Sequence, residues 1–154
     1  MRFISIATVL IFLLTFSTCL TAQSPAKPTR TTIASDDLRA VKSSAAYAEL
    51  LVRMTELSAE VESLMMDYTD EFPKVKDDKM ELELLSSEMD RLLSVKSSDA
   101  QKLTTALGKL ILGKVTNQTK LLQLRLQYAD EHPSVRRQRK IVEVYEAAIK
   151  EILG

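Results

Sequence analysis

The chain has 154 residues, enough for one domain with a modest core, and it contains three glycines and four prolines. This composition favours helices. The formal net charge is zero, which excludes the strongly basic class of nucleic-acid-binding domains and argues against nucleic acid as a partner.

The N-terminal segment has the pattern of a secretory signal. One basic residue is followed by an apolar run from Phe3 to Leu14 and then by small residues up to Ala22. We therefore predict a signal peptide over residues 1–22 and an exported protein, periplasmic or secreted. The alternatives are an uncleaved anchor over residues 3–20, which would be the only membrane contact, and lipid attachment at Cys19. Cleavage would remove the only cysteine, so the mature chain would form no disulfide.

A polar, proline-containing segment over residues 23–35 is predicted to be a flexible linker. The helical pattern then begins, with Ser35 or Asp36 as the cap. Apolar residues recur at alternating steps of three and four, which predicts helices at about 36–69, 73–96, 99–129 and 133–153. Ser98 and Gln101 have the spacing of a capping box at the start of the third helix.

The second half of the chain repeats the first at an offset of sixty residues. The apolar stripe of each helix recurs, and the phrase DYTDEFPKVKDD from Asp67 returns as QYADEHPSVRRQ from Gln127. We expect an all-α domain over residues 36–154, made of two antiparallel hairpins, 36–96 and 97–154. Their narrow stripes predict a four-helix bundle or a coiled-coil-like assembly. The alternative is an elongated hairpin stack that completes its core by oligomerising.

The two hairpins differ in charge. Residues 36–90 contain 15 acidic and 6 basic residues, a net of −9, whereas residues 91–154 contain 6 acidic and 12 basic residues, a net of +6. This difference predicts that the acidic first turn pairs with the basic second turn, within one chain or between chains.

The repeated phrase has the residues needed to reverse a helix. Proline is tolerated at the first position of a helix and keeps the preceding residue out of helical conformation. The acidic residues suit the positive end of the helix that follows, the tyrosines would close the apolar stripe, and the valines begin the returning stripe. The predicted turn residues are Tyr68, Asp70, Pro73, Val75, Tyr128, Asp130, Pro133 and Val135.

We also considered chemistry at these turns. His132 beside Asp130 and Glu131 could transfer protons, but the first repeat has Phe72 at the position of His132. Two carboxylates in each turn lack the alternating ligands and glycine of a calcium loop. The sequence therefore predicts no catalytic residue, no cofactor and no metal site.

Two other features interrupt the helical pattern. Lys114 and Asn117 fall on the stripe of the third helix, where they either fix register or mark a seam that turns partly to solvent, with Ile111 and Val115 on an adjacent apolar face. The basic run offers candidate interaction residues for the acidic hairpin or, as a weaker alternative, for an anionic polysaccharide or lipid headgroups: Arg136, Arg137, Arg139 and Lys140.

The phrases YTDEFPKV and YADEHPSV resemble the Tyr, acidic, His-Pro, Val turn in the periplasmic coiled coil of polysaccharide chain-length determinant proteins, which act in bacterial surface polysaccharide synthesis and export. This resemblance implies a periplasmic antiparallel hairpin that forms assemblies. It does not extend to the flanking membrane spans or to a glycine-rich phosphate loop. We therefore expect a non-enzymatic, exported interaction or structural protein of the cell envelope, accessory to surface polysaccharide assembly or export. The alternative is a periplasmic holdase chaperone that grips clients between long helices.

Overall fold

The computed structural model describes the backbone of residues 30–154 and the side chains of residues 36–154, and within this range the fold is entirely helical. In chain order the helices are α1 (Arg30–Lys42), α2 (Ala45–Leu64), α3 (Pro73–Leu93), the 3-10 helix η1 (Ser97–Lys102), α4 (Thr105–Gln127) and α5 (Pro133–Leu153). The predicted signal peptide over residues 1–22 and most of the predicted linker lie outside the described residues. None of the helices within residues 30–154 is long and apolar enough to cross a membrane.

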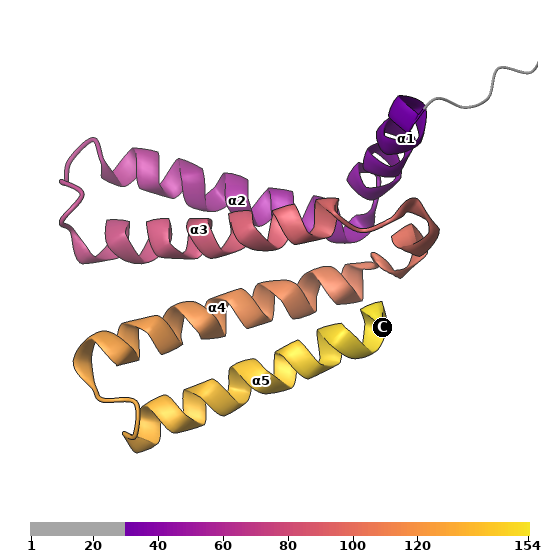
Figure 1. Ribbon diagram of the computed structural model, residues 1–154. Coiled ribbons are helices and arrows are strands. Elements are labelled where there is room, and N and C mark those ends of the chain that lie inside the picture. The colour runs from indigo at the N-terminus through magenta and orange to yellow at the C-terminus, as the bar shows by residue number, and fades with distance from the viewer. Residues whose placement is uncertain (1–29) are drawn as a thin grey trace, which may run out of the picture.

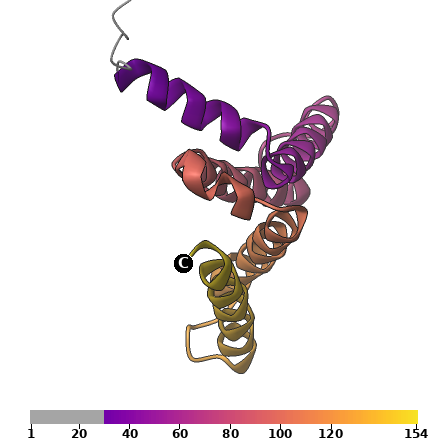
Figure 2. The ribbon, with the colours of Figure 1, turned by 90° about the vertical axis from the view of Figure 1, so that its right-hand side faces the viewer.

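The four long helices form two hairpins, α2 with α3 and α4 with α5, and both turns lie at the same end of the molecule (Figure 1). Helix α4 packs against α2 and α3 on one side and against α5 on the other. Figure 2 accordingly places α4 between the first hairpin and α5. The second hairpin is thus stacked on the first through α4, and the four helices do not close around one axis.

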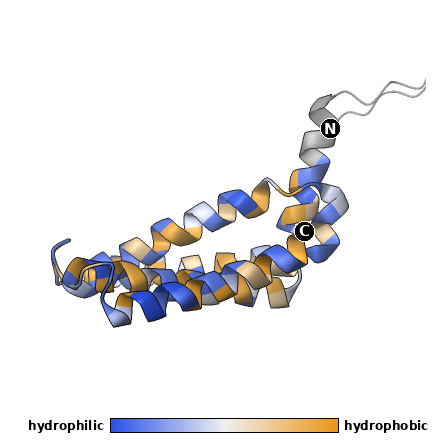
Figure 3. Ribbon diagram, turned by 60° about the horizontal axis from the view of Figure 1, so that its bottom comes forward, coloured by the Kyte–Doolittle hydropathy of each residue, from blue (hydrophilic) through white to orange (hydrophobic). Residues whose placement is uncertain are grey.

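The main core lies where α2, α3 and α4 meet. Its buried side chains include Leu50, Leu57, Leu85, Leu107 and Val115, each 0% exposed. A second, smaller cluster joins α4 to α5 near the second turn and consists of Leu121, Val135 and Val142. Apolar and polar residues alternate along every long helix (Figure 3), as expected for amphipathic helices that each bury part of their circumference.

The first expected helix is in fact two helices. The chain breaks at Ser43 and Ser44, and the Ser44 hydroxyl caps α2 by accepting the backbone N–H of Tyr47 at 3.2 Å. The preceding helix α1 begins at Arg30, inside the segment expected to be a linker. A serine cap satisfies backbone donors that a continuous helix would have paired internally, which makes the break stable.

The predicted capping box at Ser98 and Gln101 is wrong. These residues lie in η1, and α4 begins at Thr105 with the Thr104 hydroxyl accepting the backbone N–H of Leu107 at 3.3 Å. Thr104 lies sixty residues after Ser44, so the two caps are equivalent positions of the repeat.

Candidate functional site

The two turns have the same construction. Helices α3 and α5 begin at Pro73 and Pro133, the positions expected from the sequence. Val75 and Val135 follow in the first turn of each helix, and both are 0% exposed. The prolines fix where each returning helix starts, and the valines attach it to the helix before it.

An aromatic pair spans each turn. The rings of Tyr68 and Phe72 stack with centroids 4.1 Å apart, and those of Tyr128 and His132 stack at 4.3 Å. Tyr68 and Tyr128 are 49% and 43% exposed, so the partner ring covers part of each tyrosine at the surface of the turn. Such a pair adds about 0.5–1.5 kcal/mol beyond the area that it buries.

An ion pair also recurs in each turn. Asp70 contacts Lys79 at 2.7 Å, and Asp130 contacts Arg139 at 3.3 Å, with the same nine-residue separation. Asp130 is also 2.8 Å from Arg125. Both carboxylates therefore tie the turn to a helix of their own hairpin.

The His132 imidazole has a structural contact. Its Nδ1 accepts the backbone N–H of Ser134 at 3.2 Å, where it caps α5. The carboxylate of Asp130 is engaged by Arg125 and Arg139, and the described contacts include none between His132 and Asp130 or Glu131. Within residues 36–154 no group of three or more histidine, cysteine or acidic residues is placed to hold a metal ion.

The predicted pairing of the two turns is not found in the described residues. Lys76 and Lys79 contact Glu71 and Asp70 of their own turn, so most of the local charge is neutralised within the first hairpin. In the basic run, Arg139 contacts Asp130 and Lys140 contacts Glu143 at 2.9 Å. Arg136, Arg137 and Lys140 line a shallow depression beside Pro133, and neither Arg136 nor Arg137 has an ion-pair partner among the described residues.

One ion pair joins the two hairpins in the described part of the chain. The Lys114 ammonium on α4 lies 2.6 Å from Glu88 Oε1 on α3, and the same oxygen accepts Arg91 at 3.0 Å. The side chains of Lys114 and Glu88 are only 5% and 10% exposed. A partly desolvated pair of this kind is costly to break from one side, because the remaining charge keeps no adequate partner.

Lys114 and Asn117 both make polar contacts to other helices, as the first of the two alternatives expected. Lys114 is buried, so the stripe does not turn to solvent at this position. Ile111 and Val115, on the adjacent apolar face, are also buried. The Asn117 side-chain oxygen accepts the amide of Gln138 on α5 at 2.9 Å, which links the two helices of the second hairpin. Polar contacts thus set the register both between the hairpins and inside the second one.

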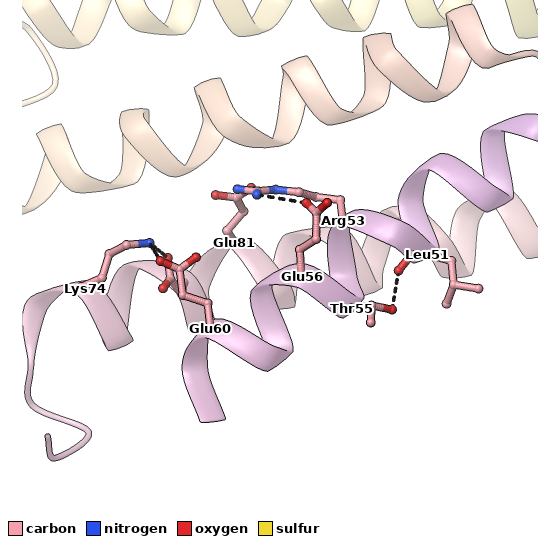
Figure 4. Close-up of polar contacts among 8 residues, drawn as sticks. Leu51, Arg53, Thr55, Glu56, Glu60, Lys74 and Glu81 are labelled. Carbon is pink, nitrogen blue, oxygen red and sulfur yellow. Dashed lines mark hydrogen bonds and ion pairs between the residues drawn. The ribbon is translucent and has the colours of Figure 1, made fainter. Parts of the chain in front are cut away.

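The first hairpin holds a buried acid at the position equivalent to Gln138. Asp78 is 3% exposed and its Oδ1 accepts the Lys74 ammonium, while Oδ2 has no hydrogen-bond partner. The hydrogen bond from Lys74 to Asp78 is the main reason why the pKa of Lys74 is raised, and Glu60 adds to it. Figure 4 shows Lys74 reaching Glu60, and Arg53 reaching Glu56 and Glu81, so charged side chains tie α2 to α3.

A cavity of about 280 Å³ lies beside the buried ion pair. Its apolar walls come from the C-terminal part of α3, from Leu103 after η1, from α4 and from the C-terminal part of α5. Glu88 and Lys114 lie at its edge, with Arg91, Glu146 and Lys150. The cavity lies where the C-terminal parts of α3 and α5 meet α4, at the end of the molecule opposite the two turns (Figure 1).

Apolar side chains are also exposed on α2 and α5. On α2, Leu51 and Val52 are 46% and 58% exposed, and on α5, Ile141 and Val144 are 42% and 60% exposed. No family model matches the sequence, and the chain shows no significant similarity to a curated protein or to a solved structure. The geometry of these surfaces therefore carries the functional argument.

Proposed function

We propose that this chain is a non-enzymatic, exported helical protein of the cell envelope that acts by association, either with itself or as an accessory to an envelope complex. The observation that carries the proposal is the exposed apolar surface on α2 and on α5. Extended apolar faces on an amphipathic helix are typical of surfaces that another helix covers. The N-terminal signal pattern supports export.

The coiled-coil-like assembly expected from the sequence belongs to this proposal. Helices α2 and α5 leave apolar side chains exposed within one chain that a further helix or hairpin would bury, namely Leu51, Val52, Ile141 and Val144. The resemblance of the turns to those of polysaccharide chain-length determinants favours an accessory role in surface polysaccharide assembly or export. Arg136 and Arg137 are the residues through which an anionic polysaccharide would bind.

The test of the proposal has two arms. Light scattering on the purified chain measures its mass in solution, and crosslinking in intact envelopes followed by pulldown identifies bound proteins. We expect self-association, an envelope partner, or both. A strictly monomeric chain that recovers no envelope partner would show the proposal to be wrong.

A holdase chaperone is a second candidate, and the cavity of about 280 Å³ together with the exposed apolar faces favours it. A holdase should suppress aggregation of a chemically denatured client at near-stoichiometric ratio. If turbidity of the client is unchanged by the protein, this candidate is excluded, whereas the association proposal is unaffected.

A further inference from the structure

Helix α4 joins the hairpins through a face of small and aliphatic residues. A Cβ added to Gly108 would lie 3.1 Å from Ala46 Cα and 3.0 Å from Glu49 Cβ, so α4 approaches α2 closely at this point. Ile111 and Val115 on the same face are 3% and 0% exposed in the core shared with α2 and α3. The residues of this stacking face are Gly108, Ile111, Leu112, Val115 and Thr119.

The equivalent face of α2 has the same character and is exposed. Sixty positions earlier the chain has Ala48, Leu51, Val52, Thr55 and Ala59, again small or aliphatic residues at helical spacing. Thr55 donates its hydroxyl to the Leu51 carbonyl at 2.8 Å, so its polar group is satisfied within the helix (Figure 4). Four of these residues, with Glu56, line a shallow depression on the surface. We call this set the α2 outer face.

Within the chain, α4 packs on a surface of α3, and the repeat gives this surface an equivalent on α5. On α3, Glu88 binds Lys114 of α4, and Leu84 and Leu85 pack in the shared core. The corresponding residues of α5 are Ala148, Val144 and Tyr145. Val144 is 60% exposed, and the neighbouring Ile141 is 42% exposed. Tyr145 packs on Gly113 of α4, whereas Val144 and Ile141 remain exposed although α5 packs on α4 and η1.

Charge favours contact between these two surfaces of different molecules. The C-terminal part of α2 carries Glu56, Glu60 and Glu62 without a basic residue, whereas residues 133–140 carry four basic residues and no acid. Glu56 and Glu60 contact Arg53 and Lys74, and Glu62, Arg136 and Arg137 have no ion-pair partner among residues 36–154. Both segments lie at the turn end of the molecule (Figure 1). If α2 of one molecule lies antiparallel to α5 of another, as α4 lies to α3 within one chain, the acidic segment of α2 comes beside the basic segment of α5.

From these equivalences we infer that a second copy of this chain is the partner, and that its α2 outer face stacks on α5 and α4 of the first copy as α4 stacks on α2 and α3 within one chain. This inference rests on the proposed function and names the partner in it. The contact joins two different surfaces, so a row of subunits would have a free α2 outer face at one end and a free α5 surface at the other. Such heterologous contacts build rings or open chains of subunits instead of closed dimers.

The test uses one glutamate on each surface. Val52→Glu blocks the α2 outer face and Val144→Glu blocks the α5 surface, and neither residue is buried within the chain. By light scattering, the unaltered chain should have an average mass above twice that of the monomer. Each variant alone should associate more than about tenfold more weakly, because the contact would bury an unpaired charge. Their equimolar mixture should form a dimer, since the intact α2 outer face of the Val144→Glu chain can stack on the intact α5 surface of the Val52→Glu chain.

The matched control is Met66→Glu. Its repeat equivalent, Leu126, is 80% exposed within the stacked hairpins, so Met66 should lie outside the contact between chains, and this variant should assemble like the unaltered chain. Circular dichroism checks that the variants stay helical. If Val52→Glu or Val144→Glu loses its helical signal, the test is repeated with Val52→Ser and Val144→Ser.

The inference is overturned if the two variants fail to complement each other, or if either assembles like the unaltered chain. It is also overturned by a monomeric unaltered chain. If the unaltered chain is monomeric but pulldown recovers an envelope protein, the inference is wrong and the proposed function is still supported. If the chain is monomeric and pulldown recovers no envelope protein, both the inference and the proposed function are wrong.

Discussion

Lys114 on α4 and Glu88 on α3 lie 2.6 Å apart across the boundary between the two hairpins, and both side chains are almost completely buried. In the first repeat the position of Lys114 is taken by Met54, and in the second repeat the position of Glu88 is taken by Ala148. The pair is therefore specific to the boundary between the two hairpins.

Replacing one member of this pair should be costly and replacing both should not. We expect Glu88→Met to lower the free energy of unfolding by about 3–5 kcal/mol, because the Lys114 ammonium would remain buried without its carboxylate. The double variant with Lys114→Met should recover most of this loss. Urea unfolding followed by circular dichroism measures both. A double variant as unstable as the single one would mean that Lys114 tolerates its site without Glu88.

The ring at position 132 should matter for stacking and not for chemistry. His132→Phe keeps a ring against Tyr128 but removes the Nδ1 acceptor that caps α5, so the free energy of unfolding should fall by about 0.5–2 kcal/mol. His132→Ala removes the same acceptor and the stack with Tyr128 as well, so it should lose about 0.5–1.5 kcal/mol more than His132→Phe. Phe72→His is the matched control in the other turn. Equal losses for His132→Phe and His132→Ala would show that the stack contributes nothing.

The Tyr145 ring packs against α4 at Gly113, where the missing side chain leaves room for it. A Cβ at residue 113 would lie 2.5 Å from Tyr145 Cε1, so Gly113→Ala should destabilise the second hairpin by about 1–3 kcal/mol despite the better helix propensity of alanine. Adding Tyr145→Leu should relieve the clash. Thermal unfolding of the three variants measures the effect, and a stabilised Gly113→Ala chain would mean that the ring moves aside freely.

The two equivalent caps should contribute equally. Ser44→Ala and Thr104→Ala each remove a hydroxyl that accepts a backbone N–H, and each should cost about 0.5–2 kcal/mol. Ser94→Ala is a control, because the Ser94 hydroxyl donates to the Arg91 carbonyl on an exposed surface and accepts no helix-start N–H. Chemical denaturation measures the free energy of unfolding of each variant. If Ser44→Ala and Thr104→Ala lose no more than Ser94→Ala, the starts of α2 and α4 are held in place by α1 and η1 and not by the hydroxyl caps.

Local sequence features predicted the all-helical fold and the helix starts at Pro73 and Pro133. Proline fixes φ regardless of the tertiary surroundings, and the sixty-residue repeat made each turn evidence for the other. The stripe residues Leu50, Leu57 and Leu85 are buried as their spacing requires. The break at Ser44 was missed because apolar residues continue in helical spacing on both sides of it.

Features that depend on long-range packing could not be predicted in this way. Glu88 and Lys114 are 26 residues apart, and only the stacking of the hairpins brings them together. The expected contact between the turns overlooked the bases within each phrase, such as Lys79 and Arg139, that are close enough to neutralise its own acids. The open arrangement follows from α4 using two faces, which a single apolar stripe does not reveal.

The position of α5 has a consequence for motion. Among residues 30–154, α5 packs on α4 and, at its C-terminal end, on η1, and its buried residues are Val135, Gln138 and Val142, which are fewer than those of α2 or α3. Helices with few buried contacts open before the rest of a protein unfolds. Backbone amides of α5 should therefore exchange their hydrogens with solvent sooner than those of α2 and α3, and a molecule bound along α5 should slow that exchange.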